Sequence, residues 1–384
     1  MRFGVGLYKM KRIFQIIILL IVLIPQLGVK ASFETAESIC LLNSITGEVV
    51  YEKNFKEKKS MASTTKIMTL ITALENSKLD DTVTVCKEAP LAEGSSAYIK
   101  ADAKISMRDL LYGLMLNSGN DAAIAVACHI SGDTKHFADL MNDTAKKIGV
   151  RNSHFKNPNG LEEEGHYTTA YDLAKITQYA MKNPDFVAIV SSKSHTAQMT
   201  LTDGTIENIE YYNHNRLLKE LDGCIGVKTG FTKAAGRCLV SATKRDGAEY
   251  IAVTLNDSDD WNTHKQLHSM AYNSQTYKTV VKQGDCIKHV IADRNECKFV
   301  AKEEYGIYVN SDSKHNIEVI THIPKKINFA INKGEKVGYL EIKANDVTIG
   351  KVDVVSDDDF SLNKDTRVKN CFVFTLSTLL RNIL

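Results

Sequence analysis

The hydrophobic pattern of this chain changes near residue 277, and this change constrains the fold more than any other feature. Before it, apolar residues at helical spacing alternate with β-branched runs. After it, six short alternating runs follow one another between Asp, Asn or Gly turns: Ile287–Ala292, Lys298–Ala301, Ile317–Ile323, Ile327–Ile331, Val337–Ile342 and Val347–Val355. A chain of 384 residues is long enough for two domains. The sequence therefore predicts an α+β domain followed by a small all-β domain.

The first part has recognisable helices and strands. Apolar residues at helical spacing predict a helix from Thr65 with Ser63 at its start, and two more helices over Met107–Leu116 and Asp121–Ile130. Extended runs on either side of turns predict strands at Ile39–Asn43 with Val49–Tyr51, and at Leu239–Thr243 with Tyr250–Leu255. The second pair is separated by Arg245-Asp246-Gly247, which favours a hairpin.

The two ends of the chain carry apolar segments of different kinds. Basic residues precede the apolar run Ile13–Ile24, which is followed by Pro25 and Gly28, a pattern typical of a removed signal peptide covering 1–31. Residues 367–384 combine an apolar helical face with Arg367, Lys369 and Arg381. This segment is too short and polar to span a membrane, but suits either the membrane surface or packing on the β domain.

Composition excludes some classes of protein. The formal net charge is +2, from 48 basic and 46 acidic residues, so nothing favours nucleic-acid binding. The eight cysteines are scattered without the compact spacing of a disulfide framework. We therefore expect most of them to be free and buried.

Three short motifs indicate chemistry: Ser63-Thr64-Thr65-Lys66, Ser118-Gly119-Asn120 and Lys228-Thr229-Gly230. The first is weak alone, because Ser-x-x-Lys occurs five times in the chain. The order of the three and their predicted context are more specific. Only the first Ser-x-x-Lys opens a clear amphipathic helix, and Ser118 and Asn120 lie in a break between helices.

These residue types suit attack on an amide. A serine hydroxyl needs a base, and Ser63 and Lys66 share one helix face. Lys66 can act as a base only if burial or a second cation lowers its pKa, and Lys228 can supply that charge. Ser118 can relay a proton between Lys66 and the leaving amine.

The pattern of residues 225–232 predicts an edge strand, which an extended peptide can join by main-chain hydrogen bonds. Gly230 lets a ligand backbone approach closely, and the N–H groups of Ser63 and Phe231 can form an oxyanion hole. Asn120 can bind the substrate backbone, while Lys228 and Thr229 can hold a terminal carboxylate.

With these motifs the chain resembles the serine-type D-Ala-D-Ala carboxypeptidases, the low-molecular-weight penicillin-binding proteins. Further similar stretches lie at residues 46–51, 61–69, 157–161, 166–174 and 329–338. The resemblance implies a penicillin-binding/β-lactamase-like fold, an antiparallel sheet flanked by helices, over 32–277. A β-rich domain over 278–366 and a membrane-associating helix over 367–384 follow.

The resemblance also implies roles and partners. Ser63 would be acylated by a peptidoglycan stem peptide or a β-lactam, with Lys66 as proton acceptor, Ser118 as relay, Lys228 as a substrate-binding residue, and no metal or cofactor. The enzyme would lie outside the cytoplasm, attached to the outer face of the cell membrane. One departure is visible: where many members carry an Arg-Phe pair, this chain has Asp260-Trp261. In those members the pair helps to hold the terminal carboxylate of the substrate. In this chain, binding of that carboxylate would instead depend on Thr229, Lys228 or Arg237.

Three alternatives compete with this interpretation. A β-lactamase shares the motifs and would use a glutamate such as Glu162, Glu163 or Glu164, but the second domain argues against it. A non-catalytic penicillin-binding sensor would need a spanning helix. A metal enzyme would use His264 and His268, yet Lys265 stands where the H-E-x-x-H motif needs glutamate.

Overall fold

The computed structural model describes residues 33–292, 295–310, 316–324 and 330–360. The expected signal segment 1–31, the expected terminal helix 367–384 and most of the expected strand Ile327–Ile331 lie outside these residues. None of the helices in the described ranges is both long and apolar enough to cross a membrane.

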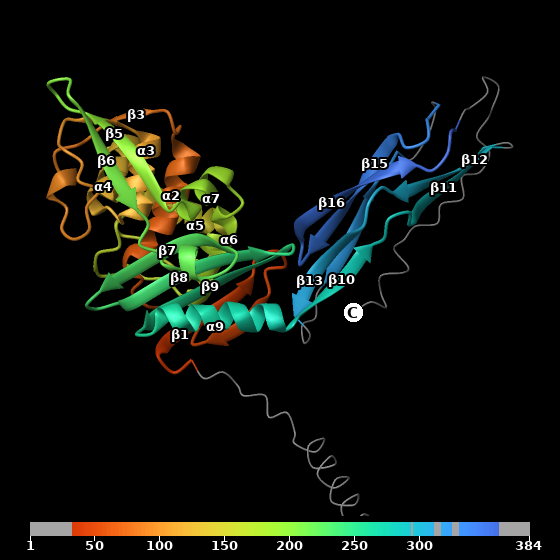
Figure 1. The fold of residues 1–384 in the computed structure, drawn as a ribbon, viewed down its shortest axis with the longest axis horizontal. Helices are drawn as coiled ribbons and strands as arrows, with labels where there is room; N and C mark the ends of the chain where they lie inside the picture. Colours follow the sequence, from red (N-terminus) through yellow and green to blue (C-terminus); the bar gives the residue numbers. More distant parts are fainter. Residues whose placement is uncertain (1–32, 293–294, 311–315, 325–329, 361–384) are drawn as a thin grey trace, which may run out of the picture. The chain divides into compact units, whose positions relative to one another are not determined.

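A five-stranded antiparallel sheet forms the centre of the first domain (Figure 1). Its strands lie in the order β2 (Val49–Lys53), β1 (Ala36–Asn43), β9 (Ala248–Asp257), β8 (Gly236–Arg245) and β7 (Cys224–Thr232). Both strand pairs expected from sequence are present, and the hairpin β8–β9 keeps a continuous register from Cys238 opposite Leu255 to Arg245 opposite Ala248. Because β7 pairs only with β8, it is an edge strand, as predicted.

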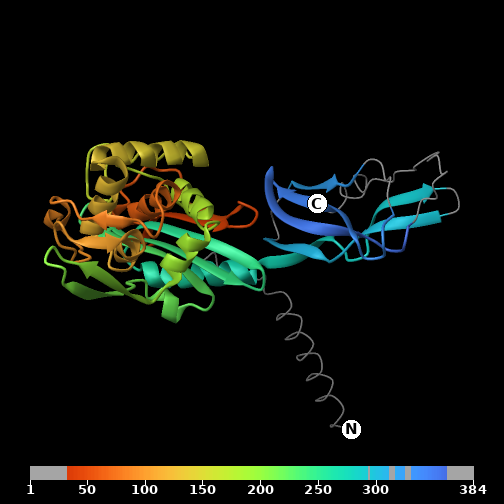
Figure 2. The ribbon, with the colours of Figure 1, turned by 90° about the horizontal axis from the view of Figure 1, so that it is seen from above.

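Helices cover both faces of this sheet (Figures 1 and 2). Helix α9 (Asp260–Asn273) packs on β1, β8 and β9, while α6 (Ala170–Ala180) and α7 (Pro184–Ser191) contact the other face. The remaining helices are η1 (Ala62–Thr65), α2 (Lys66–Asn76), η2 (Ala89–Leu91), α3 (Met107–Leu116), α4 (Asn120–Ser131), α5 (Thr134–Ile148) and α8 (Leu217–Glu220). A smaller sheet has the order β3 (Thr82–Thr84), β4 (Lys104–Ser106), β5 (Ser194–Thr200) and β6 (Ile206–Tyr212).

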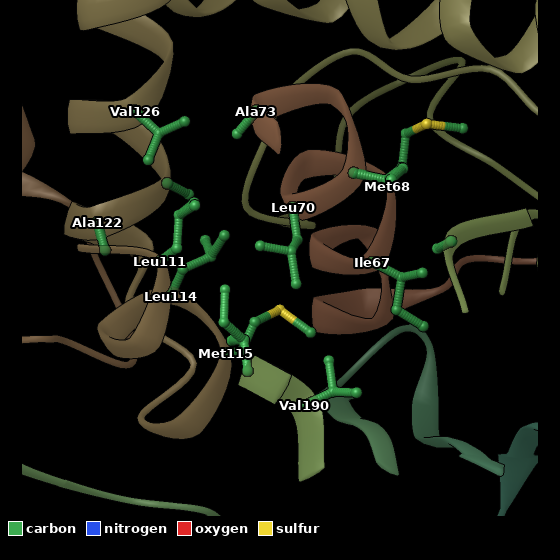
Figure 3. Close-up of a cluster of buried hydrophobic side chains, with 14 of the residues drawn as sticks. Ile67, Met68, Leu70, Ala73, Leu111, Leu114, Met115, Ala122, Val126 and Val190 are labelled. Atoms are coloured by element: carbon green, nitrogen blue, oxygen red, sulfur yellow. The ribbon is translucent and has the colours of Figure 1, made fainter. Parts of the chain in front are cut away.

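Helix α2 is the buried centre of the helical layer. All eight residues from Lys66 to Ala73 are buried. Figure 3 shows Leu70 between the side chains of α3, α4 and α7, among them Leu114, Met115 and Val190. Each fully buried aliphatic side chain contributes about 1.5–3 kcal/mol. This packing fixes the helix whose first turn carries the Ser-x-x-Lys motif.

The second domain is all-β, as expected. It contains a two-stranded sheet of β10 (Gln275–Val281) and β13 (Tyr305–Asn310), and a five-stranded sheet in the order β11 (Cys286–Ala292), β12 (Asn295–Ala301), β16 (Val347–Ser356), β15 (Lys336–Ala344) and β14 (Ile317–His322). A separate apolar cluster that includes Phe299, Leu340 and Val352 forms its core.

Two sequence expectations differ from the structure. Strands β10 and β13 were not predicted, because the polar residues of β10 and Gly306 within β13 obscure the period-two pattern. All seven cysteines in the described residues are free, but only Cys40, Cys238 and Cys297 are buried. Cys286 is exposed because it begins β11, an edge strand.

Candidate active site

Ser63 and Lys66 meet at the junction of η1 and α2. Ser63 is half-buried in the 3-10 turn, and Lys66, the first residue of α2, is fully buried. The Lys66 Nζ atom lies 3.1 Å from Ser63 Oγ, 2.6 Å from Asn120 Oδ1 and 2.7 Å from the main-chain oxygen of Asn159. The two shorter contacts are to carbonyl oxygens, which can only accept, whereas a hydroxyl can also donate. A neutral amine in this position therefore directs its lone pair at the Ser63 hydroxyl.

Two buried lysines control the charge of the site. Burial lowers the pKa of Lys66 well below 10.5, and the nearby charge of Lys228 lowers it further, while Asp121 opposes this effect. Burial also lowers the pKa of Lys228 to about 7. The Lys228 ammonium donates a hydrogen bond of 3.0 Å to Thr229 O. Within the described residues, neither lysine has a carboxylate oxygen within 4.0 Å.

The turn between α3 and α4 places the second motif beside the first. Ser118 has a left-handed backbone (φ +59°) and is only 5% exposed. Asn120 begins α4, and its amide accepts from Lys66 and donates to Glu93 O at 2.6 Å. Asn120 therefore holds Lys66 in place, and substrate binding by its remaining N–H stays a prediction.

The third motif lies on β7, at the sheet edge. Gly230 packs against the η1 turn that carries Ser63: a Cβ at this position would lie 3.0 Å from Thr64 N and 3.1 Å from Ser63 N. These contacts are tighter than an ordinary Cβ contact, so a side chain here would push the two backbones apart and glycine suits this close approach. Lys228 is buried, whereas Phe231 is 66% exposed.

These elements surround an open cleft of about 330 Å³. Its wall brings together residues of all three motifs with others distant in sequence: Ser63, Ser95, Ser118, His214, Thr229, Gly230, Phe231, Arg237, Asp260 and Trp261. Sequence reasoning missed Ser95 and His214, since neither lies in a motif. Burial and the charge of Lys228 lower the pKa of His214.

The carboxylates and histidines of the alternative interpretations lie elsewhere. Glu162, Glu163 and Glu164 are exposed, and the cleft wall does not include them. His264 and His268 are buried, and their four ring nitrogens lie 2.6–3.1 Å from the hydroxyls of Ser241, Thr243 and Thr254. The described residues also include Cys86, Glu88 and Cys128, whose ligand atoms lie within 4.8 Å of one another, also outside the cleft wall.

The fold and the site define a serine peptidase that carries a Ser-x-x-Lys motif in its cleft. Residues 27–259 match the D-alanyl-D-alanine carboxypeptidase family, and residues 276–361 match a domain described as the C-terminal domain of penicillin-binding protein 5. The chain therefore belongs to the D-alanyl-D-alanine carboxypeptidase family. The predicted family and the predicted fold are both confirmed.

Individual relatives agree with this assignment. The chain is 31% identical to D-alanyl-D-alanine carboxypeptidase DacF of Bacillus subtilis, over 84% of this chain and 85% of that protein. The crystal structure of the Streptomyces K15 DD-transpeptidase superimposes with a TM-score of 0.58 at 36% identity, covering 62% of this chain and 96% of that one. DacD from Francisella tularensis gives a TM-score of 0.60 at 28% identity, covering 85% and 94%.

Proposed function

We propose that this enzyme removes the terminal D-alanine from peptidoglycan stem pentapeptides through an acyl-enzyme on Ser63, and that β-lactams acylate the same serine. The observation that carries this proposal is the contact of the Ser63 hydroxyl with a buried lysine whose two other contacts are carbonyl oxygens. Family membership supports a D-alanyl-D-alanine carboxypeptidase activity.

Acylation begins with proton transfer. Lys66 takes the Ser63 proton as Oγ attacks the carbonyl carbon of the penultimate D-alanine. The N–H groups of Ser63 and Phe231 stabilise the oxyanion, and the close packing of Gly230 on Ser63 brings these two segments together. When the C–N bond breaks, the proton passes through Ser118 to the leaving amine, and free D-alanine departs.

Deacylation reverses the proton path. Water attacks the ester carbonyl while Lys66 accepts its proton, and the proton then returns to Ser63 Oγ as the ester bond breaks. The products are the shortened peptide and the regenerated enzyme. The edge position of β7 supports binding of the substrate as an added strand along Lys228, Thr229 and Gly230.

The test uses two serines that share the Ser-x-x-Lys pattern. Ser63→Ala should abolish both labelling by a fluorescent penicillin and D-alanine release from a pentapeptide. Ser153→Ala is the matched control, because Ser153 precedes Lys156 with the same spacing but bonds Thr168 and Asp172 outside the cleft wall. It should keep both activities. Labelling of Ser63→Ala, or rapid turnover of penicillin by the natural protein, would contradict the proposal.

We also propose export and membrane attachment. The basic and apolar pattern of residues 1–31 supports a removed signal peptide, and the apolar face and basic residues of 367–384 support binding to an anionic membrane surface. The mature chain should pellet with vesicles of anionic lipid and be partly released by high salt. A chain ending at Asn370 should stay in the supernatant. If it pellets equally well, the terminal segment does not attach the enzyme.

A further inference from the structure

Arg237 of β8 brings a guanidinium group into the wall of the cleft that contains Ser63. Its side chain is 42% exposed, so its guanidinium group is accessible to a ligand in the cleft without a change of conformation. An enzyme that removes a C-terminal residue must distinguish a free carboxylate from a continuing chain. Arginine suits this task, because its planar fork binds both oxygens of a carboxylate.

A buried carboxylate holds this guanidinium in place. Asp260 has a side chain only 3% exposed, and its Oδ1 accepts hydrogen bonds from Arg237 Nε at 3.1 Å and Nη2 at 2.7 Å. A guanidinium has five N–H donors, so three remain for a ligand. The Trp261 ring lies 5.7 Å from the guanidinium carbon and limits its movement further. Asp260 and Trp261 therefore orient Arg237 before substrate arrives.

The strand register places Arg237 beside the proposed oxyanion hole. Across the β7–β8 ladder, Arg237 is opposite Phe231, whose N–H is the proposed oxyanion donor. A peptide bound along β7 advances about 3.3 Å per residue, so the residue after the scissile bond lies about one residue's rise from this pair, within reach of the long Arg237 side chain. That residue is the one whose carboxylate is free.

We propose that Arg237, held by Asp260, binds the terminal carboxylate of the substrate and so makes the enzyme select free C-termini. This inference rests on the proposed function. Asp260 and Trp261, which stand where many family members carry Arg-Phe, then support an arginine supplied from β8. Arg237 is a substrate-binding residue and takes no part in proton transfer.

Two peptides test the proposal: an acylated Lys-D-Ala-D-Ala and the same peptide with a C-terminal carboxamide. The natural enzyme should prefer the acid in kcat/KM. Arg237→Leu should lower kcat/KM for the acid by on the order of 100-fold, mainly through KM, and for the amide by less than about threefold. The ratio of kcat/KM for the acid to kcat/KM for the amide should therefore fall close to one.

Arg216→Leu is the matched control. The Arg216 guanidinium carbon lies 5.1 Å from the same Trp261 ring, but Arg216 pairs with surface Glu220 and the cleft wall does not include it. This variant should keep the acid preference. Because Arg237→Leu leaves Asp260 buried without its partner, the double variant Arg237→Leu, Asp260→Leu provides a second test in which no charge is left unpaired. The double variant should lose the preference for the acid in the same way, with the urea unfolding transition followed by Trp261 fluorescence as the measure of correct folding.

The outcomes separate this inference from the proposed function. If the natural enzyme releases no D-alanine from the acid, the proposed function is wrong and the inference is overturned with it. If the acid is cleaved but both Arg237 variants keep the natural ratio, or lose both substrates equally, the function stands and the carboxylate role of Arg237 is overturned. The same holds if Arg216→Leu collapses the ratio as strongly.

Discussion

The free energy of unfolding should reveal how strongly the fold disfavours a charge on Lys228. This side chain is 2% exposed, and burial lowers its pKa from 10.5 to about 7. One pKa unit corresponds to about 1.4 kcal/mol, so below pH 7 the buried ammonium destabilises the fold by on the order of 5 kcal/mol. Between pH 7 and 10.5 the unfolded chain binds more protons here than the folded one. Stability therefore increases as the pH rises through that window.

Lys228→Met removes the amine and keeps an unbranched side chain. Its hydrogen bond to Thr229 O is also lost, at a cost of about 1 kcal/mol. We expect the variant to be more stable than the natural enzyme by about 4 kcal/mol at pH 6, and less stable by about 0.5–1 kcal/mol at pH 10.5, where only the lost hydrogen bond remains. Urea unfolding followed by the fluorescence of Trp261, the single tryptophan, reports on the catalytic domain.

The control is Lys233→Met, because Lys233 follows the same strand but is exposed. It should change the free energy of unfolding by less than about 0.5 kcal/mol at every pH. If Lys228→Met is less stable at pH 6, or its effect does not vary with pH, the fold compensates the buried ammonium. Burial would then not be the cause of the low lysine pKa values, and the account of Lys66 as a neutral base would lose its physical basis.

Three further predictions follow from neighbouring residues. Lys66→Arg should be as slow in β-lactam acylation as Lys66→Ala, because a guanidinium stays protonated; rapid acylation would place the base elsewhere. Gly160→Ala should lower the free energy of unfolding in urea by more than about 3 kcal/mol, since its Cβ would lie 2.0 Å from Ala62 O at φ +90°. Gly132→Ala, at φ +84° with nothing within 4 Å, should cost only about 1–2 kcal/mol, and equal losses would refute the steric argument. Burial lowers the pKa of His166 from 6.5 to about 4, so about 3 kcal/mol of the free energy of unfolding should be lost as the pH falls across that range. His166→Gln should remove most of this loss. If the free energy of unfolding of the variant falls equally steeply with pH, His166 is not its cause.

Sequence reasoning succeeded where the signal is local. Ser63 and Lys66 are three residues apart on one helix, so their proximity follows from helix geometry alone. The edge position of Lys228 followed from a short strand with a glycine where another backbone approaches. Apolar spacing alone predicted helix α3 with both of its ends.

It failed where a residue acts through its backbone or through distant packing. Asn159 contributes a main-chain oxygen to Lys66, and every residue has one. His214 and Ser95 line the cleft but lie far from the three motifs in sequence, so only the folded chain brings them there. Arg237 and Asp260 are 23 residues apart, and only the packing of α9 on β8 pairs them.

The protonation state of Lys66 depends on which oxygens surround it. Asp121 is adjacent to Asn120, and its carboxylate would hold Lys66 protonated if it replaced the Asn120 amide. Instead the Asp121 oxygens accept hydrogen bonds from Ala97 N at 2.7 Å, Ala122 N at 2.8 Å and Ser96 Oγ at 2.6 Å. These donors satisfy the acid and anchor the segment that carries Ser95. The Asp121 carboxylate is thus engaged by other donors, and the hydrogen-bond partners of Lys66 are all neutral oxygens. Burial among neutral acceptors favours the uncharged form of Lys66, which is what a general base requires and what a structural ion pair would prevent.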